Sequence, residues 1–79
     1  MAQLHITNGF SKPLPGLGQN TSFSKLSRKR VSRCVREEGL RPHYGTYDVS
    51  VTCEPRFDGV CWRGECQING KPEQFWVSP

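Results

Sequence analysis

The sequence predicts an α+β fold, with one amphipathic helix packed on a three- to four-stranded antiparallel sheet in the order β-α-β-β-β. Three observations predict it. A run without Gly or Pro extends from Lys25 to Glu38, apolar and polar residues alternate after residue 46, and Asp58-Gly59 and Asn69-Gly70 are typical of two-residue hairpin turns. At 79 residues, the chain is expected to form a single domain, 1–79.

The first part of the chain predicts one strand and a long loop. Leu4 and Ile6 alternate with polar neighbours, which favours a short half-buried strand over residues 3–7. Prolines and glycines recur over residues 8–21, and this composition excludes a helix or a central strand. We therefore expect a Gly/Pro loop over 8–21.

A helix is predicted over residues 22–38. Thr21, Ser22 or Ser24 can serve as its N-cap, Gly39 is a natural residue just beyond its end, and Pro42 prevents continuation. At 100° per residue, one side collects the residues expected to face the sheet: Phe23, Ser27, Val31, Cys34 and Val35.

The rest of the chain predicts an antiparallel meander over residues 46–78. A two-residue turn at Asn69-Gly70 places Trp62 opposite Val77 and Arg63 opposite Trp76, and one at Asp58-Gly59 places Val51 opposite Cys66. The same registers direct three cysteines to the core, Cys34, Cys53 and Cys66, and leave Cys61 exposed. The strand at 3–7 is expected to supply a fourth strand.

Composition limits the partners. Hydrophobic residues make up 34% and charged residues 23%, so the chain is not expected to be disordered. Eleven Lys and Arg against seven Asp and Glu give a net charge of +4, which excludes an acidic DNA mimic and suits nucleic acid or an acidic protein surface. No apolar run approaches the ~18 residues of a membrane span and no secretory leader is evident, so a cytoplasmic location, no membrane partner and reduced thiols are expected.

Two candidate binding surfaces follow from these predictions. The outer side of the helix is expected to carry a basic stripe of Lys25, Lys29, Arg33 and Arg36, which Arg28 and Arg30 widen. It either contacts phosphates or an acidic surface, or is simply a solvated face. On the outer face of the sheet, Arg63 and Trp76 are expected to stack as a cation–π pair, although Trp76 could instead pack under the Gly/Pro loop.

No catalytic or metal site is predicted, and no cofactor. The cysteine spacing lacks the close pairs of a zinc site, although His43 is a conceivable fourth ligand. No acid, base and nucleophile are brought together by any motif. We therefore expect a protein that is not an enzyme.

The order strand, long loop, helix and three-stranded meander, from Gln3 to Val77, resembles that of small phage-encoded anti-CRISPR proteins and, in its α-β-β-β part, that of double-stranded-RNA-binding domains. The resemblance lies in topology, without a shared motif, and no second helix follows the last strand. A likeness to anti-CRISPR proteins implies a non-enzymatic protein that docks on a CRISPR surveillance complex.

Three hypotheses for function remain. The first is an interaction protein of a phage or mobile element that binds and inhibits or modulates a host nucleoprotein complex, through the basic stripe and the Arg63–Trp76 face. The second is a direct nucleic-acid-binding regulatory module, and the third is a small secreted domain held by disulfides. An unpaired edge of the meander could also support a homodimer.

Overall fold

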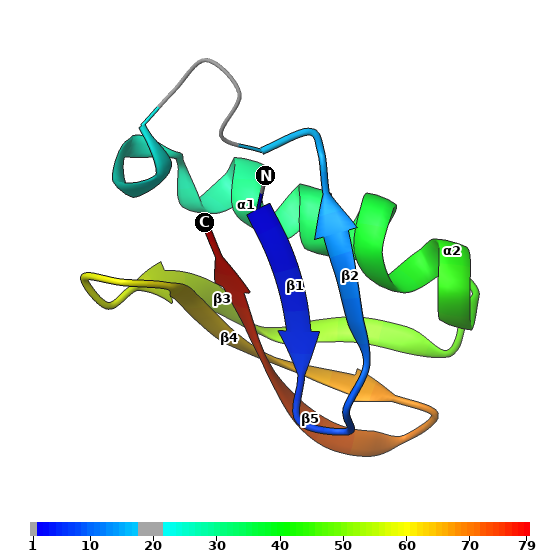
Figure 1. The fold of residues 1–79 in the computed structure, drawn as a ribbon. Coiled ribbons are helices and arrows are strands. Elements are labelled where there is room, and N and C mark those ends of the chain that lie inside the picture. The colour runs from blue at the N-terminus through cyan, green and yellow to red at the C-terminus, as the bar shows by residue number, and fades with distance from the viewer. Residues whose placement is uncertain (1, 18–21) are drawn as a thin grey trace.

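A computed structural model describes residues 2–17 and 22–79 and shows one helix lying on a five-stranded antiparallel sheet (Figure 1). The α+β class with a single helix is confirmed, with five strands rather than three or four. The sheet has the order β2-β1-β5-β4-β3, with strands β1 (Ala2–Ile6), β2 (Ser11–Leu14), β3 (Val49–Phe57), β4 (Trp62–Ile68) and β5 (Lys71–Ser78).

The additional strand lies inside the predicted loop. The expectation of a continuous loop over 8–21 is wrong at β2, which pairs with β1 and forms one edge of the sheet. Pro13 is tolerated there because an edge strand does not need every backbone N–H for pairing. The predicted N-terminal strand is found as β1 and pairs with β5 on its other side.

The helix runs from Arg28 to Tyr44, so the predicted bounds of 22–38 are wrong at both ends. Its first segment is α1 (Arg28–Cys34), and its N-cap is Ser27, whose hydroxyl accepts a hydrogen bond from the Arg30 N–H at 3.1 Å. The other N-cap candidates do not cap α1. Ser22 precedes a separate 3₁₀ turn, η1 (Phe23–Lys25), Ser24 lies within that turn, and Thr21 lies outside the described residues.

A π-helical segment lets the helix continue past Gly39 and Pro42. The segment η2 (Val35–Leu40) follows α1 and leads directly into α2 (Arg41–Tyr44). The Arg41 N–H donates to the Arg36 carbonyl, five residues back, and Pro42 follows in the first turn of α2, where a missing N–H costs little. The helix ends at Gly45, which has a positive φ of 93°.

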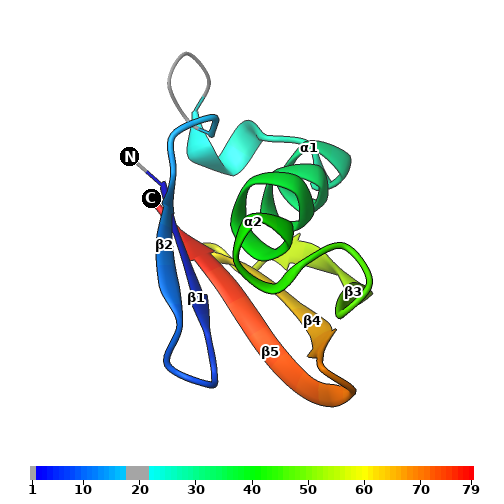
Figure 2. The ribbon, with the colours of Figure 1, turned by 90° about the vertical axis from the view of Figure 1, so that its right-hand side faces the viewer.

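The helix lies over one face of the sheet (Figure 2), and the buried residues of the core come from both layers. Leu26, between η1 and α1, is buried in this cluster. Trp62 donates its indole N–H to the Phe23 carbonyl at 3.1 Å and so ties η1 to β4. The residues without measurable exposure include Leu4, Leu14, Val31, Val35, Leu40, Cys66 and Val77.

Gly39 has a packing role rather than a terminating one. It is buried, and a Cβ placed on it would lie 2.5 Å from Cδ2 of Leu4 on β1, which is itself fully buried. The helix backbone therefore approaches the sheet more closely here than any residue with a side chain would allow.

The predicted register of β4 and β5 is confirmed. Asn69 and Gly70 form the turn, with Ile68 paired with Lys71 and Trp62 with Val77. Arg63 and Trp76 are cross-strand partners, as expected.

The register of β3 and β4 is confirmed at one end only. Val51 pairs with Cys66 as predicted, but Phe57 pairs with Trp62, so residues 58–61 form the loop in place of a two-residue turn. Two register shifts, one between Val51 and Cys53 and one between Cys53 and Arg56, connect the pairing at Val51 with the pairing at Phe57.

These irregularities exchange the surroundings of two cysteines. Cys53 is exposed and Cys61 is buried, the reverse of the prediction, while Cys34 and Cys66 are buried as expected. The shift between Val51 and Cys53 turns Cys53 to the other face of its strand, and the four-residue loop leaves Cys61 before the start of β4, where the alternation of a strand no longer decides its direction. All four cysteines are free thiols in the structure.

Alkylation of the native protein tests this exchange. We expect a thiol reagent to modify Cys53 rapidly and the other three cysteines only after unfolding, since reagents reach exposed thiols first. Peptide mapping by mass spectrometry identifies the site, and Cys53→Ser is the control that should stay unmodified. Rapid labelling of Cys61 would contradict the described register.

A double-mutant cycle tests the contact of Gly39 with β1. Gly→Ala in a helix ordinarily stabilises by up to about 1 kcal/mol. Here Gly39→Ala should instead lower the free energy of unfolding by about 1–3 kcal/mol, because its methyl group has no room beside Leu4. In a Leu4→Ala background the same change should cost less. Urea unfolding measures both, and stabilisation of the wild-type background by Gly39→Ala would contradict the packing.

Candidate functional site

The predicted basic residues of the helix divide between two elements. Arg28, Lys29 and Arg33 are exposed on α1, and Arg36 follows on η2 with 35% of its side chain exposed. Lys25 lies apart from them on η1, separated by the turn that contains the Ser27 cap. The structure therefore brings together all members of the predicted stripe except Lys25.

These side chains line a hollow, here called the basic groove, with a volume of about 690 Å³. Ser27 and Ser32 contribute from α1, and Glu54 contributes from β3. Five of its lining residues are basic: Arg28, Lys29, Arg30, Arg33 and Arg36. With a single carboxylate among its lining residues, the groove has a strongly positive field.

Most of the positive charge in the basic groove is not neutralised by other residues in the ranges 2–17 and 22–79. Among the described residues, Arg28, Lys29 and Arg33 form no ion pair. Arg30 donates from Nη2 to the carbonyl of Gly16 at 3.0 Å, a neutral partner that holds the side chain without cancelling its charge. Four cationic side chains of the groove therefore have no anionic partner among the described residues: Arg28, Lys29, Arg30 and Arg33.

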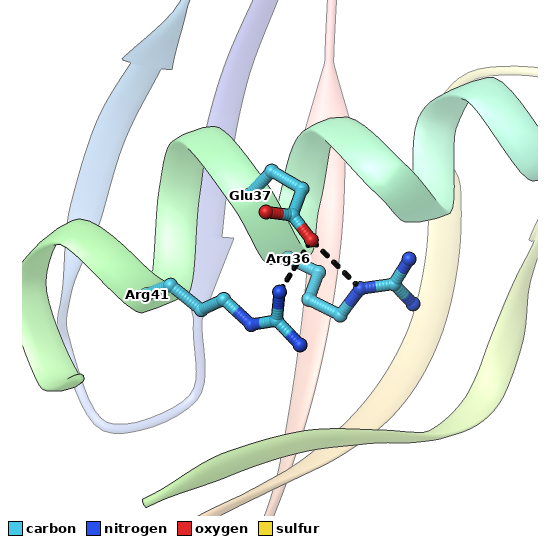
Figure 3. Close-up of polar contacts among 3 residues, drawn as sticks. All are labelled: Arg36, Glu37 and Arg41. Atoms are coloured by element: carbon cyan, nitrogen blue, oxygen red, sulfur yellow. Dashed lines mark hydrogen bonds and ion pairs between the residues drawn. The ribbon is translucent and has the colours of Figure 1, made fainter. Parts of the chain in front are cut away.

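One end of the basic groove is partly neutralised. Glu37 receives Arg36 Nε at 3.4 Å and Arg41 Nη1 at 2.5 Å on the same carboxylate oxygen, Oε1 (Figure 3). One carboxylate shared by two guanidinium groups leaves a net positive charge. Exposed ion pairs of this kind contribute at most about 1 kcal/mol, so Arg36 can exchange Glu37 for another anion.

Arg63 and Trp76 lie on the other side of the sheet, away from the basic groove. Their predicted cation–π stack is not formed: the Arg63 guanidinium pairs with the carboxylate of Asp58, and Trp76 stacks on His5, with ring centroids 5.3 Å apart and an interplanar angle of 16°. The alternative was that Trp76 packs under the Gly/Pro loop. In the part of that loop that forms β2, Ser11–Leu14 pair with β1 and extend the sheet sideways instead of covering its outer face.

Sequence reasoning missed three residues of these surfaces. Glu54 and Arg56 were not assigned because their faces depend on the register shifts in β3. His5 was not connected with Trp76 because the pairing of β1 with β5 joins opposite ends of the chain. No local signal in the sequence marks either relation.

The buried thiols are poorly suited to nucleophilic chemistry. Burial raises the pKa of Cys34 to about 11, and the hydrogen bond from its thiol to Glu38 Oε2, 3.1 Å long, acts in the same direction. Burial also raises the pKa of Cys66 to about 11, with a further contribution from the charge of Glu73. Both are therefore protonated at neutral pH.

The described residues, 2–17 and 22–79, offer neither a metal site nor a membrane-spanning helix. No cluster of three or more His, Cys, Asp or Glu side chains in these ranges could hold a metal ion. His43, the conceivable fourth ligand, contacts the rings of Phe10 and Tyr44. None of the helices described is both long and apolar enough to cross a membrane.

Titration of Asp58 tests the loop that holds Arg63. The backbone N–H of Cys61, then the Arg63 guanidinium and the Val60 N–H, hold the pKa of the Asp58 carboxyl well below its usual range. A lowered folded-state pKa means that the ionised carboxyl stabilises the fold above the unfolded value of about 3.9, and that this stabilisation is lost as the pH falls towards the folded value.

We therefore expect the side-chain ¹³C signal of Asp58 to titrate at clearly lower pH in the folded protein than in the urea-unfolded chain. The difference in stability between wild type and Asp58→Asn should also shrink as the pH falls below about 4. Equal titration midpoints in the folded and unfolded chains would show that this loop is not formed as described.

Comparison with known proteins supplies no family for this chain. No protein-family model matches it, and no curated protein or solved structure does so either.

Proposed function

We propose that this protein is a non-enzymatic binding protein that docks on the phosphate backbone of nucleic acid, free or within a nucleoprotein complex, through the basic groove. One observation carries the proposal: Arg28, Lys29 and Arg33 line one hollow and have no anionic partner among the described residues. Cations held side by side without counterions favour a polyanion, since binding releases the ions condensed on its phosphates.

The spacing of these residues suits an extended ligand. Lys29, Arg33 and Arg36 follow one another at intervals of about one helical turn, or about 5.4 Å along the axis. They therefore present a line of charge rather than a single point. Arginine also matches phosphate oxygens with two parallel hydrogen bonds, whereas lysine acts as a compact charge.

A second candidate is that the basic groove docks on an acidic protein surface of a host nucleoprotein complex and inhibits it, as the resemblance to anti-CRISPR proteins implies. The modest net charge of +4 favours this alternative, because proteins that bind duplex DNA without sequence preference usually make many phosphate contacts. The two candidates use the same side chains and differ in how steeply binding depends on salt.

Fluorescence anisotropy across a salt series tests the nucleic-acid proposal, with labelled random-sequence duplex and single-stranded DNA as probes. We expect binding at low salt that weakens from about 50 to about 200 mM, with a log–log slope of about −0.9 per phosphate contacted on duplex DNA. The double variant Lys29→Glu/Arg33→Glu should bind much more weakly and reduce the slope by about 2, because each cation accounts for one phosphate contact.

The matched control is Lys12→Glu/Lys71→Glu, which makes the same change in net charge at two lysines outside the basic groove. It should retain most of the affinity. Absence of binding at low salt, or equal losses in the two double variants, would overturn the proposal. The second candidate would then be tested by retention of a host complex on the wild-type protein but not on Lys29→Glu/Arg33→Glu.

A further inference from the structure

Four strands each contribute one side chain to a single row across the outer face of the sheet. His5 on β1 pairs with Trp76 on β5, Trp76 with Arg63 on β4, and Arg63 with Arg56 on β3. Directly paired residues lie on the same face, and adjacent strands are about 4.8 Å apart, so this outer row spans about 14 Å. The helix lies on the opposite side of the sheet (Figure 2).

One half of the outer row is aromatic and pre-arranged. The rings of His5 and Trp76 are nearly parallel, at 16°, and the hydroxyl of Ser78 lies 3.0 Å from His5 Nε2 and holds the imidazole in place. Both rings are half-buried, so their orientation is already restricted before any ligand arrives.

The free side of Trp76 borders a small hollow. His5 occupies the β1 side of the indole, and the strand order places β4 on its other side. There a hollow of about 240 Å³ is lined by Trp76 and Arg63 together with Gln74 and Glu65. This is smaller than the sites of drug-sized ligands and suits one planar ring. Its lining includes the amide of Gln74 and the carboxylate of Glu65, groups that can hydrogen-bond the edge of a polar ring.

The other half of the outer row carries excess positive charge. Arg56 stands directly opposite Arg63, and like charges in this position destabilise a sheet. Asp58 neutralises Arg63, whereas Arg56 has no ion-pair partner among the described residues. An anion beside the hollow would remove this imbalance.

We propose that the outer row binds single-stranded nucleic acid, with an unpaired base stacked on Trp76 in the hollow and a phosphate held by Arg56 and Arg63. A planar ring and an adjacent phosphate occur together in a nucleotide, and a base is free to stack only where the strand is unpaired. The inference concerns base stacking on the face opposite the basic groove and does not rest on the function proposed for that groove.

The position of β3 allows one single-stranded nucleic acid to reach both the outer row and the basic groove. Glu54 of β3 lines the basic groove, and Arg56, two residues later, ends the outer row. β3 is an edge strand, so nothing in the sheet lies beyond it. A single-stranded nucleic acid bound along the outer row can therefore pass around the β3 edge and reach Arg28 and Arg33 in the basic groove.

Titration with a short single-stranded DNA and with a hairpin duplex of the same composition tests the proposal. Single strands should quench the fluorescence of Trp76, whereas buried Trp62 contributes an unchanged background. Because Trp76→Leu lacks the quenched indole, its affinity is read from the anisotropy of fluorescently labelled DNA. It should bind single strands about 5- to 150-fold more weakly, as expected for the loss of one stacked base, with duplex affinity unchanged. Trp76→Phe, which keeps an aromatic face, should retain most of the single-strand affinity.

Two further variants separate this surface from the basic groove. Arg56→Ala should weaken single-strand binding and leave duplex binding unaltered, and Lys29→Glu/Arg33→Glu should still show quenching by single strands at a higher concentration. Urea unfolding of each variant confirms that it remains folded. Unchanged single-strand affinity in folded Trp76→Leu, or equal losses for duplex and single strand, would overturn the proposal even if the basic groove binds duplex.

Discussion

Where Gly39 meets Leu4, the helix lies too close to the sheet for any side chain at residue 39, and the placement of the helix on the sheet depends on this contact. A Cβ at residue 39 would overlap the leucine side chain, so the two backbones come together only because the residue is glycine. The contact lies in the π segment, which carries the helix on to Tyr44 despite Pro42. Val35 and Leu40 are fully buried within the same segment. A helix held down in this way covers one face of the sheet and leaves the other without a helix (Figure 1).

The irregular strand β3 decides which side chains meet on each surface. Its two register shifts accommodate a four-residue loop at one end and the regular pairing of Val51 with Cys66 at the other. Within the second shift, Glu54 lines the basic groove and Pro55 is buried, and Arg56 directly after it lies on the outer face. Bulges often redirect side chains at sheet edges in this way. Both proposed surfaces therefore meet at this strand.

The charges of the molecule are distributed unevenly although its net charge is small. Five basic side chains surround one carboxylate in the basic groove, and two arginines with a single acidic partner end the outer row. The acidic residues mostly act locally: Asp58 orders its loop, Glu37 bridges Arg36 and Arg41, and Glu38 accepts the thiol of Cys34. An anionic partner is attracted most strongly to the sites where positive charge remains unpaired.

The sequence by itself determined the α+β class, the burial of Val31, Cys34 and Val35 on the helix, the exposed basic residues from Arg28 to Arg33 and the register of β4 with β5, whereas Phe23 and Ser27, expected on the same helix face, lie in η1 and at the exposed N-cap. These follow from periodicity and from the Asn69-Gly70 turn, and both signals act over a few residues. Only the tertiary structure decided the rest. The end of the helix at Tyr44, the burial of Cys61 in place of Cys53, and the partners of Arg63 and Trp76 all depend on segments distant in the chain. The physical reason is that propensity and pattern specify which face is apolar, whereas close packing and strand pairing specify which residue meets which.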